Sequence, residues 1–124
     1  MRNAEELSKD NGGITVSIAL NYGGRQDILH AVRELAKFED ISKMDDEALQ
    51  SSFEKRLMTQ NLPEPDLLIR TSGEQRSSHF LLWQCAYSEF WFCETLWPDF
   101  GKTQLEEAIG VFNARERRFG GLKA

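Results

Sequence analysis

The sequence has little cysteine and no long uninterrupted apolar run. Only two cysteines occur among 124 residues, Cys85 and Cys93, each within an apolar stretch. Two are too few for a disulfide-stapled scaffold, so both are expected to be buried free thiols in a reducing compartment. The longest apolar stretch, residues 80–97, is interrupted by glutamine, serine and glutamate side chains. A membrane-spanning segment is therefore not expected.

Positive charge is also in short supply. Lysine and arginine number 15 against 20 aspartates and glutamates, which gives a net charge of −5. Such a chain has no overall attraction to nucleic acid or to an anionic membrane, so no nucleic-acid partner is expected and any membrane contact is peripheral. Residues 1–13 resemble neither a signal peptide nor a transit peptide. The expected location is the cytoplasm or the membrane periphery, and any anion site must be local.

Patterns typical of strands alternate along the chain with patterns typical of helices. Short runs rich in β-branched, aliphatic or aromatic side chains predict strands at 14–20, 66–70 and 90–95. Apolar side chains at helical spacing predict helices at 26–38, 48–58, 80–87 and 103–118. The expected caps are Asp45 or Asp46 for the second helix, Ser77 or Ser78 for the third, and a capping box from Thr103 for the last.

This alternation predicts an α/β fold in which a parallel sheet of about three strands has flanking helices. Three parallel strands make a narrow sheet, because sheets usually have about five or six strands, and a narrow one leaves an apolar edge open. Residues 1–124 are therefore expected to form a single partial domain that belongs to a larger sheet.

The loop after the second predicted strand concentrates groups that bind anions. It begins at Arg70, reads RTSGEQRSS, and places Arg76, Ser78 and a predicted helix N-terminus close together. Guanidiniums and helix N-terminal amides bind phosphate oxygens, so the loop suits a diphosphate. A nearby carboxylate, Glu74 or Glu89, is a candidate ligand for Mg²⁺. The alternative is that both arginines simply pair with these glutamates at a helix entrance.

Three other features carry a weaker signal or none. The Asn21-Tyr-Gly-Gly24 turn either cradles an anion at the next helix or is an ordinary strand-to-helix turn. His30 and His79 have no partners at metal-ligand spacing. The dense aromatic residues between 80 and 100 favour a core or a subunit interface over a cofactor site.

Six consecutive motifs resemble those of the cis-prenyltransferases, the family that includes undecaprenyl and dehydrodolichyl diphosphate synthases. They span essentially the whole chain but correspond only to the C-terminal half of the family's domain. In chain order they are NYGGR at 21–25, PDLLIRTSGEQR at 65–76, FLLWQ at 80–84, AYSE at 86–89, LWPDF at 96–100 and RERRFGG at 115–121.

The resemblance implies an enzyme that condenses isopentenyl diphosphate onto an allylic diphosphate, such as farnesyl diphosphate, with Mg²⁺ as cofactor and a polyprenyl diphosphate as product. By the same resemblance, Arg70, Arg76 and Ser78 bind the diphosphate of isopentenyl diphosphate. Glu89 matches the glutamate that the family associates with Mg²⁺, and Asn21 and Arg25 line the same face.

The resemblance also implies a dimer, because Arg118-Phe-Gly120 matches a motif that reaches a partner's substrate. A homodimer or a heterodimer with another family subunit would satisfy it. The family's Asp-Gly-Asn-Arg loop, which supplies the aspartate for Mg²⁺ and the allylic diphosphate, has no counterpart in the sequence, so the catalytic residue stays unassigned. The alternatives are a non-catalytic subunit or scaffold of a heteromeric enzyme, and an inactive fragment.

Overall fold

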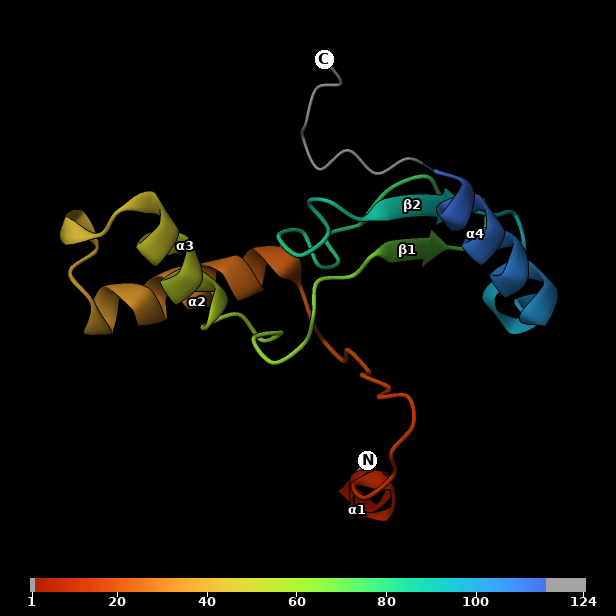
Figure 1. The fold of residues 1–124 in the computed structure, drawn as a ribbon, viewed down its shortest axis with the longest axis horizontal. Helices are drawn as coiled ribbons and strands as arrows, with labels where there is room; N and C mark the ends of the chain where they lie inside the picture. The colour runs from red at the N-terminus through yellow and green to blue at the C-terminus, as the bar shows by residue number, and fades with distance from the viewer. Residues whose placement is uncertain (1, 116–124) are drawn as a thin grey trace.

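The computed structural model describes residues 2–115, with a pair of helices at one end and two strands with a helix at the other (Figure 1). Parallel strands flanked by helices confirm the predicted α/β class. In chain order the elements are α1 Arg2–Ser8, α2 Gly24–Phe38, the 3-10 turn η1 Ile41–Lys43, α3 Asp46–Glu54, β1 Leu67–Arg70, β2 Glu89–Phe92, the 3-10 turn η2 Trp97–Asp99, and α4 Lys102–Ala114.

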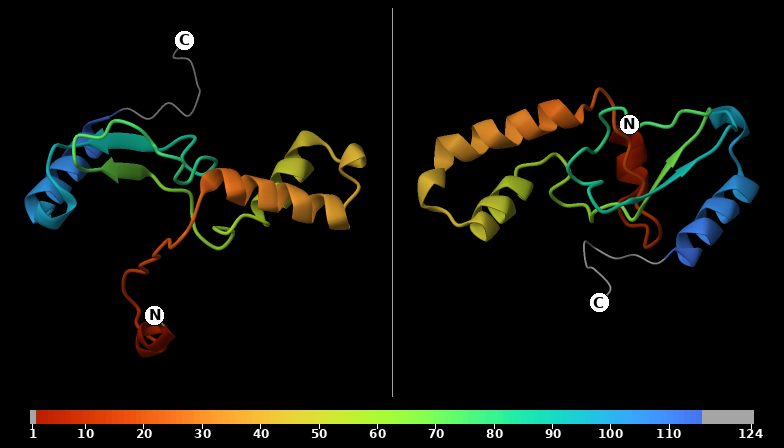
Figure 2. Two further views of the ribbon diagram at one scale, coloured as in Figure 1. Left: turned by 180° about the vertical axis from the view of Figure 1, so that it is seen from behind. Right: turned by 90° about the horizontal axis from the view of Figure 1, so that it is seen from above.

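The sheet consists of β1 and β2, which run parallel from the pair Leu67 and Glu89 to the pair Arg70 and Phe92. β1 falls inside the predicted run 66–70, whereas β2 overlaps the predicted run 90–95 but begins one residue before it, at Glu89. The ladder is extended beyond the strands where the backbone N–H of Cys93 donates to the carbonyl of Arg70 at 3.0 Å. Helix α4 packs against β2, as the views in Figure 2 also show.

The predicted strand at 14–20 is not formed, so the sheet has two strands and not about three. The segment has no regular secondary structure, and the side chains of Ile14 and Val16 are 94% and 78% exposed. A β-strand is stabilised by hydrogen bonds to a neighbouring strand, and within residues 2–115 this segment belongs to no sheet. The prediction of a strand at 14–20 is therefore wrong for the residues that the structure describes.

The predicted helix at 80–87 is also wrong, because these residues form a series of turns. Ser78, His79 and Leu81 have φ values of 48°, 69° and 49°. Left-handed backbone in non-glycine residues cannot begin a right-handed helix, so neither Ser77 nor Ser78 serves as its cap.

The other predicted helices are present with shifted boundaries. Asp45 caps α3 as predicted, accepting a hydrogen bond from the N–H of Ala48 at 2.8 Å, although α3 stops at Glu54. Helix α4 begins after Gly101, whose N–H donates to the side chain of Gln104 at 3.0 Å, and not at a box headed by Thr103.

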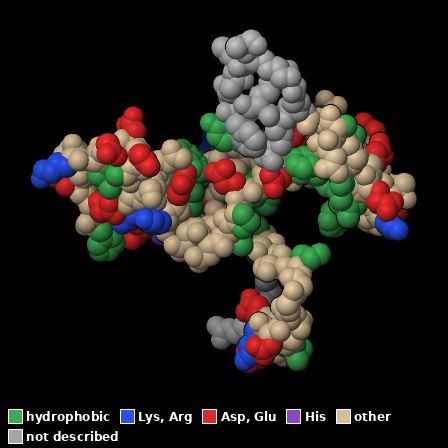
Figure 3. Space-filling model, viewed as in Figure 1, with side chains coloured by type: hydrophobic (Ala, Val, Ile, Leu, Met, Phe, Trp, Pro, Cys, Tyr) green, Lys and Arg blue, Asp and Glu red, His purple; other side chains and the backbone are tan. Residues whose placement is uncertain are grey.

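The main hydrophobic core lies between α2 and α3. Ala31 and Leu35 of α2 are buried against Phe53 and Leu57, with Ile28 and Leu49 packed at the margin. Elsewhere many apolar side chains reach the surface, and some of them show as patches beside acidic residues in Figure 3. In the part of the chain that the structure describes, no helix has the length and apolarity needed to cross a bilayer.

Candidate functional site

The loop that leaves β1 holds the two predicted arginines together. Arg70, the last residue of β1, donates to the carbonyl of Arg76 at 2.6 Å, and its guanidinium lies 3.8 Å from the Glu74 carboxylate. Arg76 forms an ion pair with the same carboxylate. The pairing with Glu74 that the sequence allowed is therefore present. Two guanidiniums share one carboxylate, which leaves the loop with a surplus of positive charge.

Arg70 and Arg76 differ in how freely they can meet a ligand. The Arg70 side chain is 24% exposed, whereas that of Arg76 is 65% exposed. The half-buried end of β1 holds the Arg70 guanidinium in place, and the loop presents the Arg76 guanidinium to solvent. This arrangement suits one orienting contact and one adaptable contact with an anion.

Backbone hydrogen bonds fix the start of this loop over the end of β2. Ser72 donates its N–H to Thr95 and Gly73 donates to Cys93, both at 2.9 Å. Gly73 has a φ of 69°, and a Cβ there would lie 2.6 Å from a carboxylate oxygen of Glu94. Glycine is favoured at this position on both conformational and steric grounds.

A cavity of about 380 Å³ lies beside the loop. Arg70, Thr71, Ser77 and Ser78 line it with polar groups, and Phe80, Leu81 and Cys85 are among its apolar walls. Burial raises the pKa of the Cys85 thiol, so this cysteine is an inert wall and not a nucleophile. The cavity therefore has the polar and apolar parts that a small amphiphilic anion requires.

The turn at Asn21 is brought against the same loop. The N–H of Gly24 donates to the carbonyl of His79 at 2.8 Å. A Cβ on Gly24 would lie 2.9 Å from that carbonyl, and one on Gly23 would lie 2.6 Å from the His79 ring. Glycine is needed at 24, where the close neighbour is backbone, whereas the side chains beside Gly23 can move. The approach places exposed Asn21, with a φ of 54°, beside the second loop.

Asp27, in the first turn of α2, is a buried hub behind this site. It is 1% exposed and accepts hydrogen bonds from the Tyr22 hydroxyl at 2.8 Å, the N–H of Met58 at 2.9 Å and the Gln84 amide at 3.3 Å. Burial, together with Asp27, raises the pKa of Tyr22 to about 12. The signal was present in the sequence, because Asp27 shares the spacing of Ala31 and Leu35 on the buried face of α2.

Glu89 lies apart from the arginine loop. It begins β2, whereas Arg70 ends β1 opposite Phe92, and three residues of strand span about 10 Å. Its carboxylate accepts a hydrogen bond from Arg115 at 2.5 Å. Within residues 2–115 no group of three or more His, Cys, Asp or Glu side chains could hold a metal ion. The predicted residues Arg118 and Gly120 lie outside the described residues.

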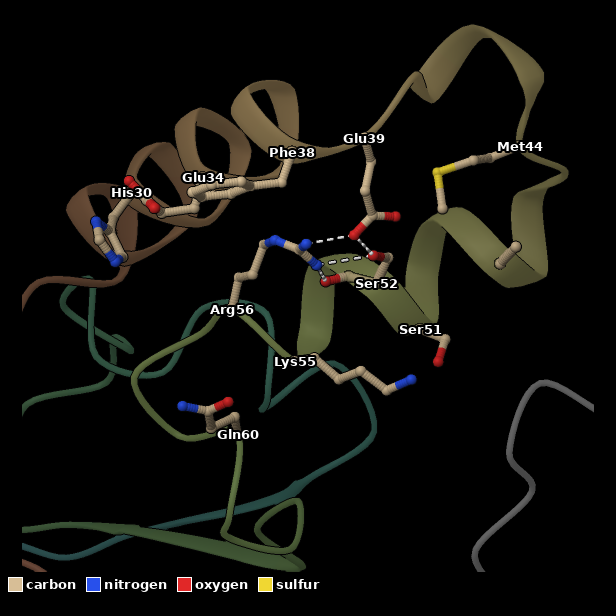
Figure 4. Close-up of a pocket in the computed structure, with 11 residues that line it drawn as sticks. His30, Glu34, Phe38, Glu39, Met44, Ser51, Ser52, Lys55, Arg56 and Gln60 are labelled. Atoms are coloured by element: carbon tan, nitrogen blue, oxygen red, sulfur yellow. Dashed lines mark hydrogen bonds and ion pairs between the residues drawn. The ribbon is translucent and has the colours of Figure 1, made fainter.

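A second and larger cavity, of about 890 Å³, opens between α2 and α3 (Figure 4). Its polar centre is a closed network in which Arg56 donates to the carbonyl and hydroxyl of Ser52 at 2.6 and 2.7 Å and also binds Glu39. The Ser52 hydroxyl, with Arg56, lowers the pKa of Glu39. The polar groups of Glu39, Ser52 and Arg56 are hydrogen-bonded to one another. Because Glu39 follows α2 and Ser52 lies in α3, the network joins the two helices.

Comparison with known proteins gives consistent matches. A family model described as "Putative undecaprenyl diphosphate synthase" matches residues 1–120. The chain is 50% identical over 123 residues to an isoprenyl transferase of Lactococcus lactis, covering 98% of this chain and 50% of that one. It is also 50% identical over 122 residues to the (2E,6E)-farnesyl-diphosphate-specific ditrans,polycis-undecaprenyl-diphosphate synthase of Micrococcus luteus, covering 96% and 48%.

A solved structure has the same fold. Lavandulyl diphosphate synthase from Lavandula x intermedia, in complex with dimethylallyl diphosphate, superposes with a TM-score of 0.84 at 42% identity, covering 96% of this chain and 52% of that one. The chain thus spans about half the length of the relatives it matches.

Proposed function

The chain belongs to the undecaprenyl diphosphate synthase family of cis-prenyltransferases, and we propose that it is the isopentenyl-diphosphate-binding half of such a transferase. The observation that carries this proposal is the Arg70–Arg76 loop beside an amphiphilic cavity. The product of the complete enzyme would be a polyprenyl diphosphate, formed from isopentenyl diphosphate and an allylic diphosphate such as farnesyl diphosphate.

In this proposal the loop binds the diphosphate and the cavity receives the hydrocarbon. Arg70, fixed at the end of β1, and the more exposed Arg76 bind phosphate oxygens, with the Ser78 hydroxyl as a further donor. Phe80 and Leu81 supply apolar walls for the five-carbon chain. Holding the diphosphate at one end orients the double bond at the other, which lowers the entropic part of the barrier.

Glu74 sets the balance of charge at this site. Both arginines form ion pairs with its carboxylate, so it holds their guanidiniums near one another. A bound diphosphate would compete with the Glu74 carboxylate for the N–H groups of the two guanidiniums. The carboxylate would still lie between the two arginines.

Asn21 and Arg25 are proposed to line the neighbouring face. The hydrogen bond from Gly24 to His79 joins their turn to the loop that carries Ser78, and both side chains are exposed. They are therefore available to a substrate, although the anion contacts are assigned to the arginine loop.

The described residues do not fit a Mg²⁺ site at this loop. Mg²⁺ binds carboxylates together with substrate phosphates, but Glu89 is paired with Arg115 at the other end of β2 and Glu74 is paired with both arginines. The assignment of Glu89 to Mg²⁺ in the complete enzyme stays a prediction from the family resemblance.

A non-catalytic subunit of a heteromeric enzyme is the alternative that the sequence left open. A homodimer or heterodimer, with Arg118 and Gly120 reaching a partner's substrate, remains part of either proposal. Retention of both arginines favours the substrate-binding half over the non-catalytic subunit.

Calorimetric titration with isopentenyl diphosphate, with and without Mg²⁺, tests the site. Arg76→Ala is expected to weaken binding by about 30-fold, since a charge-assisted contact contributes about 2 kcal/mol. Arg33→Ala, which removes an exposed arginine of α2, is the matched control and should leave affinity unchanged. Equal affinity in the Arg76 and Arg33 variants would refute the site assignment.

A further inference from the structure

Glu89 lies at the end of the sheet that is opposite the anion site. It is the first residue of β2 and pairs with Leu67, the first residue of β1. The loop that carries Arg70 and Arg76 leaves the other end of the parallel strands, about 10 Å away. Mg²⁺ binds its oxygen ligands at about 2.1 Å, which makes Glu89 poorly placed to share an ion with an anion held by that loop. The contacts of Glu89 lead instead to the end of α4.

The Glu89 carboxylate is already bound to a cation of the chain. Nη1 of Arg115 donates to a carboxylate oxygen of Glu89 at 2.5 Å and to the carbonyl of Phe90 at 3.3 Å. The Glu89 side chain is 24% exposed and that of Arg115 is 45% exposed. A charge-assisted hydrogen bond to a largely buried carboxylate is stronger than an ion pair between fully exposed side chains. Two acceptors on successive residues of β2 therefore hold the Arg115 guanidinium in place.

Apolar contacts hold α4 only loosely. The helix packs against β2, but within the described chain Ala108 is the one residue of α4 that is buried. Leu105 and Ile109 of the same helix are 43% and 44% exposed. Burial of an apolar face is what usually stabilises a helix in a protein. Because α4 buries so little, the contacts of Arg115 contribute a larger share of the energy that fixes its end.

Arg115 stands where the chain leaves the helix. It follows Ala114, the last residue of α4, and its backbone is extended, with a φ of −84° and a ψ of 141°. The sequence continues RERRFGG from this residue, so Arg118 and Gly120 come three and five positions later. Three residues of chain span at most about 11 Å. A fixed Arg115 therefore restricts Arg118 to a sphere of that radius, whatever conformation the chain takes between them.

We propose that Glu89 is a positioning residue and not a ligand of a metal ion. By holding Arg115 at the start of β2, it fixes the point from which the chain continues to Arg118 and Gly120. This role stands in place of the Mg²⁺ contact that the family resemblance assigns to Glu89. It rests on the proposed function in one respect, because the substrate contact of Arg118 and Gly120 is part of that function.

Exchanging the two charges separates the two roles that Glu89 can have. Glu89→Arg and Arg115→Glu each place like charges together, whereas the double variant restores an ion pair of opposite polarity. A positioning role needs only the attraction between the two side chains, so the double variant keeps it. A metal ligand needs the carboxylate at position 89 itself, because a guanidinium has no acceptor atom for a cation.

Hydrogen exchange measures whether the end of α4 is held. Each single charge-reversed variant should speed exchange at the amides of residues 110–115 by about 10-fold or more, and the double variant should return it to within about threefold of the original rate. Lys102→Ala, which removes an exposed ion pair with Glu106 at the other end of α4, is the matched control and should leave these amides unchanged. Unchanged exchange in both single variants, or a double variant as fast as the singles, would overturn the proposal.

Titration with Mn²⁺, followed by electron paramagnetic resonance, tests the metal alternative on the same positions. Carboxylates bind Mn²⁺ as they bind Mg²⁺. Glu89→Ala and the double charge-reversed variant should bind Mn²⁺ to the same extent as the unmodified chain, and absence of binding in all three also agrees with the proposal. A loss of Mn²⁺ affinity of about fivefold or more in both variants would overturn it and return Glu89 to the metal.

A double-mutant cycle connects Glu89 to the substrate contact. In calorimetric titration with isopentenyl diphosphate, Glu89→Ala and Arg118→Ala should each weaken binding by about fivefold or more, and the double variant should be no weaker than Arg118→Ala alone. Factors that multiply in the double variant, or unchanged affinity in either single variant, would overturn the link to the substrate. A chain that does not bind isopentenyl diphosphate at all would refute the proposed function, whereas the exchange and Mn²⁺ results would still decide the role of Glu89.

Discussion

Removing the Asp27 carboxylate should destabilise the chain more than removing any other single acidic side chain in the described residues. Asp27 is the buried acceptor for three donors from three segments: Tyr22 before α2, Met58 after α3, and Gln84 in the turns before β2. Asp27→Ala deletes all three hydrogen bonds at once. The turn, the helix pair and the loop then lose their common attachment.

The expected magnitude follows from what each donor can do afterwards. The N–H of Met58, in a part-buried hydrogen bond, loses its acceptor, which costs about 1–2 kcal/mol. Gln84 keeps a hydrogen bond to Thr59 at 2.8 Å, and half-buried Tyr22 can turn to water, so each adds about 1 kcal/mol or less. The sum is about 3 kcal/mol, or roughly a 150-fold change in the folding equilibrium constant.

Urea unfolding followed by circular dichroism measures this loss. Tyr22→Phe removes only one of the three bonds and should cost about 1 kcal/mol, which keeps the test informative if the alanine variant is too unstable to fold. Asp10→Ala, at an exposed site, is the control and should cost nothing measurable. The role of Asp27 as a hub would be refuted if Asp27→Ala lowered the free energy of unfolding by less than about 1 kcal/mol. The dependence of that free energy on urea concentration has to be unchanged for the comparison to hold.

Three further predictions concern ionisation, thiol access and close packing. The pKa of Tyr22 is about 12 in the folded chain and near 10 in the unfolded chain. The contribution of Tyr22 to stability should therefore be constant below pH 10 and be lost as the pH rises from 10 to 12. Melting curves of Tyr22→Phe should lack that part of the decline. A thiol reagent should modify half-buried Cys93 before Cys85, which is 7% exposed and should react only as the chain unfolds; equal rates would contradict the packing. Gly24→Ala should cost about 1–3 kcal/mol and weaken diphosphate binding, because its Cβ meets the carbonyl of His79, whereas Gly12→Ala, with open space around it, should be neutral in both assays.

Elements whose signals are local were predicted from the sequence. The apolar stripe of α2, the Asp45 cap of α3 and the apolar run of β1 each act within a few residues, and each element formed. The same is true of the pairing between Arg70 and Arg76 through Glu74, because these residues share one short loop. Composition and spacing were enough to predict these features because the contacts that form them are made between residues close together in the sequence.

Elements that depend on distant partners were not predicted correctly. Residues 14–20 have the composition of a strand but no strand beside them among residues 2–115. The residues from Phe80 to Tyr87 have helical spacing, yet the backbone at Ser78, His79 and Leu81 is left-handed. In both segments the secondary structure depends on contacts with residues far away in the sequence, which the local pattern of side chains does not specify.

The sequence by itself determined the α/β class, the family motifs and the set of side chains that can bind a diphosphate. The tertiary structure decided which of them meet: it joined the Gly24 turn to the His79 loop, set Asp27 behind both, and separated Glu89 from the arginines by the length of β2. The physical reason is that a motif specifies residue types and local geometry, whereas proximity across the chain depends on hydrogen bonds and packing between segments far apart in sequence.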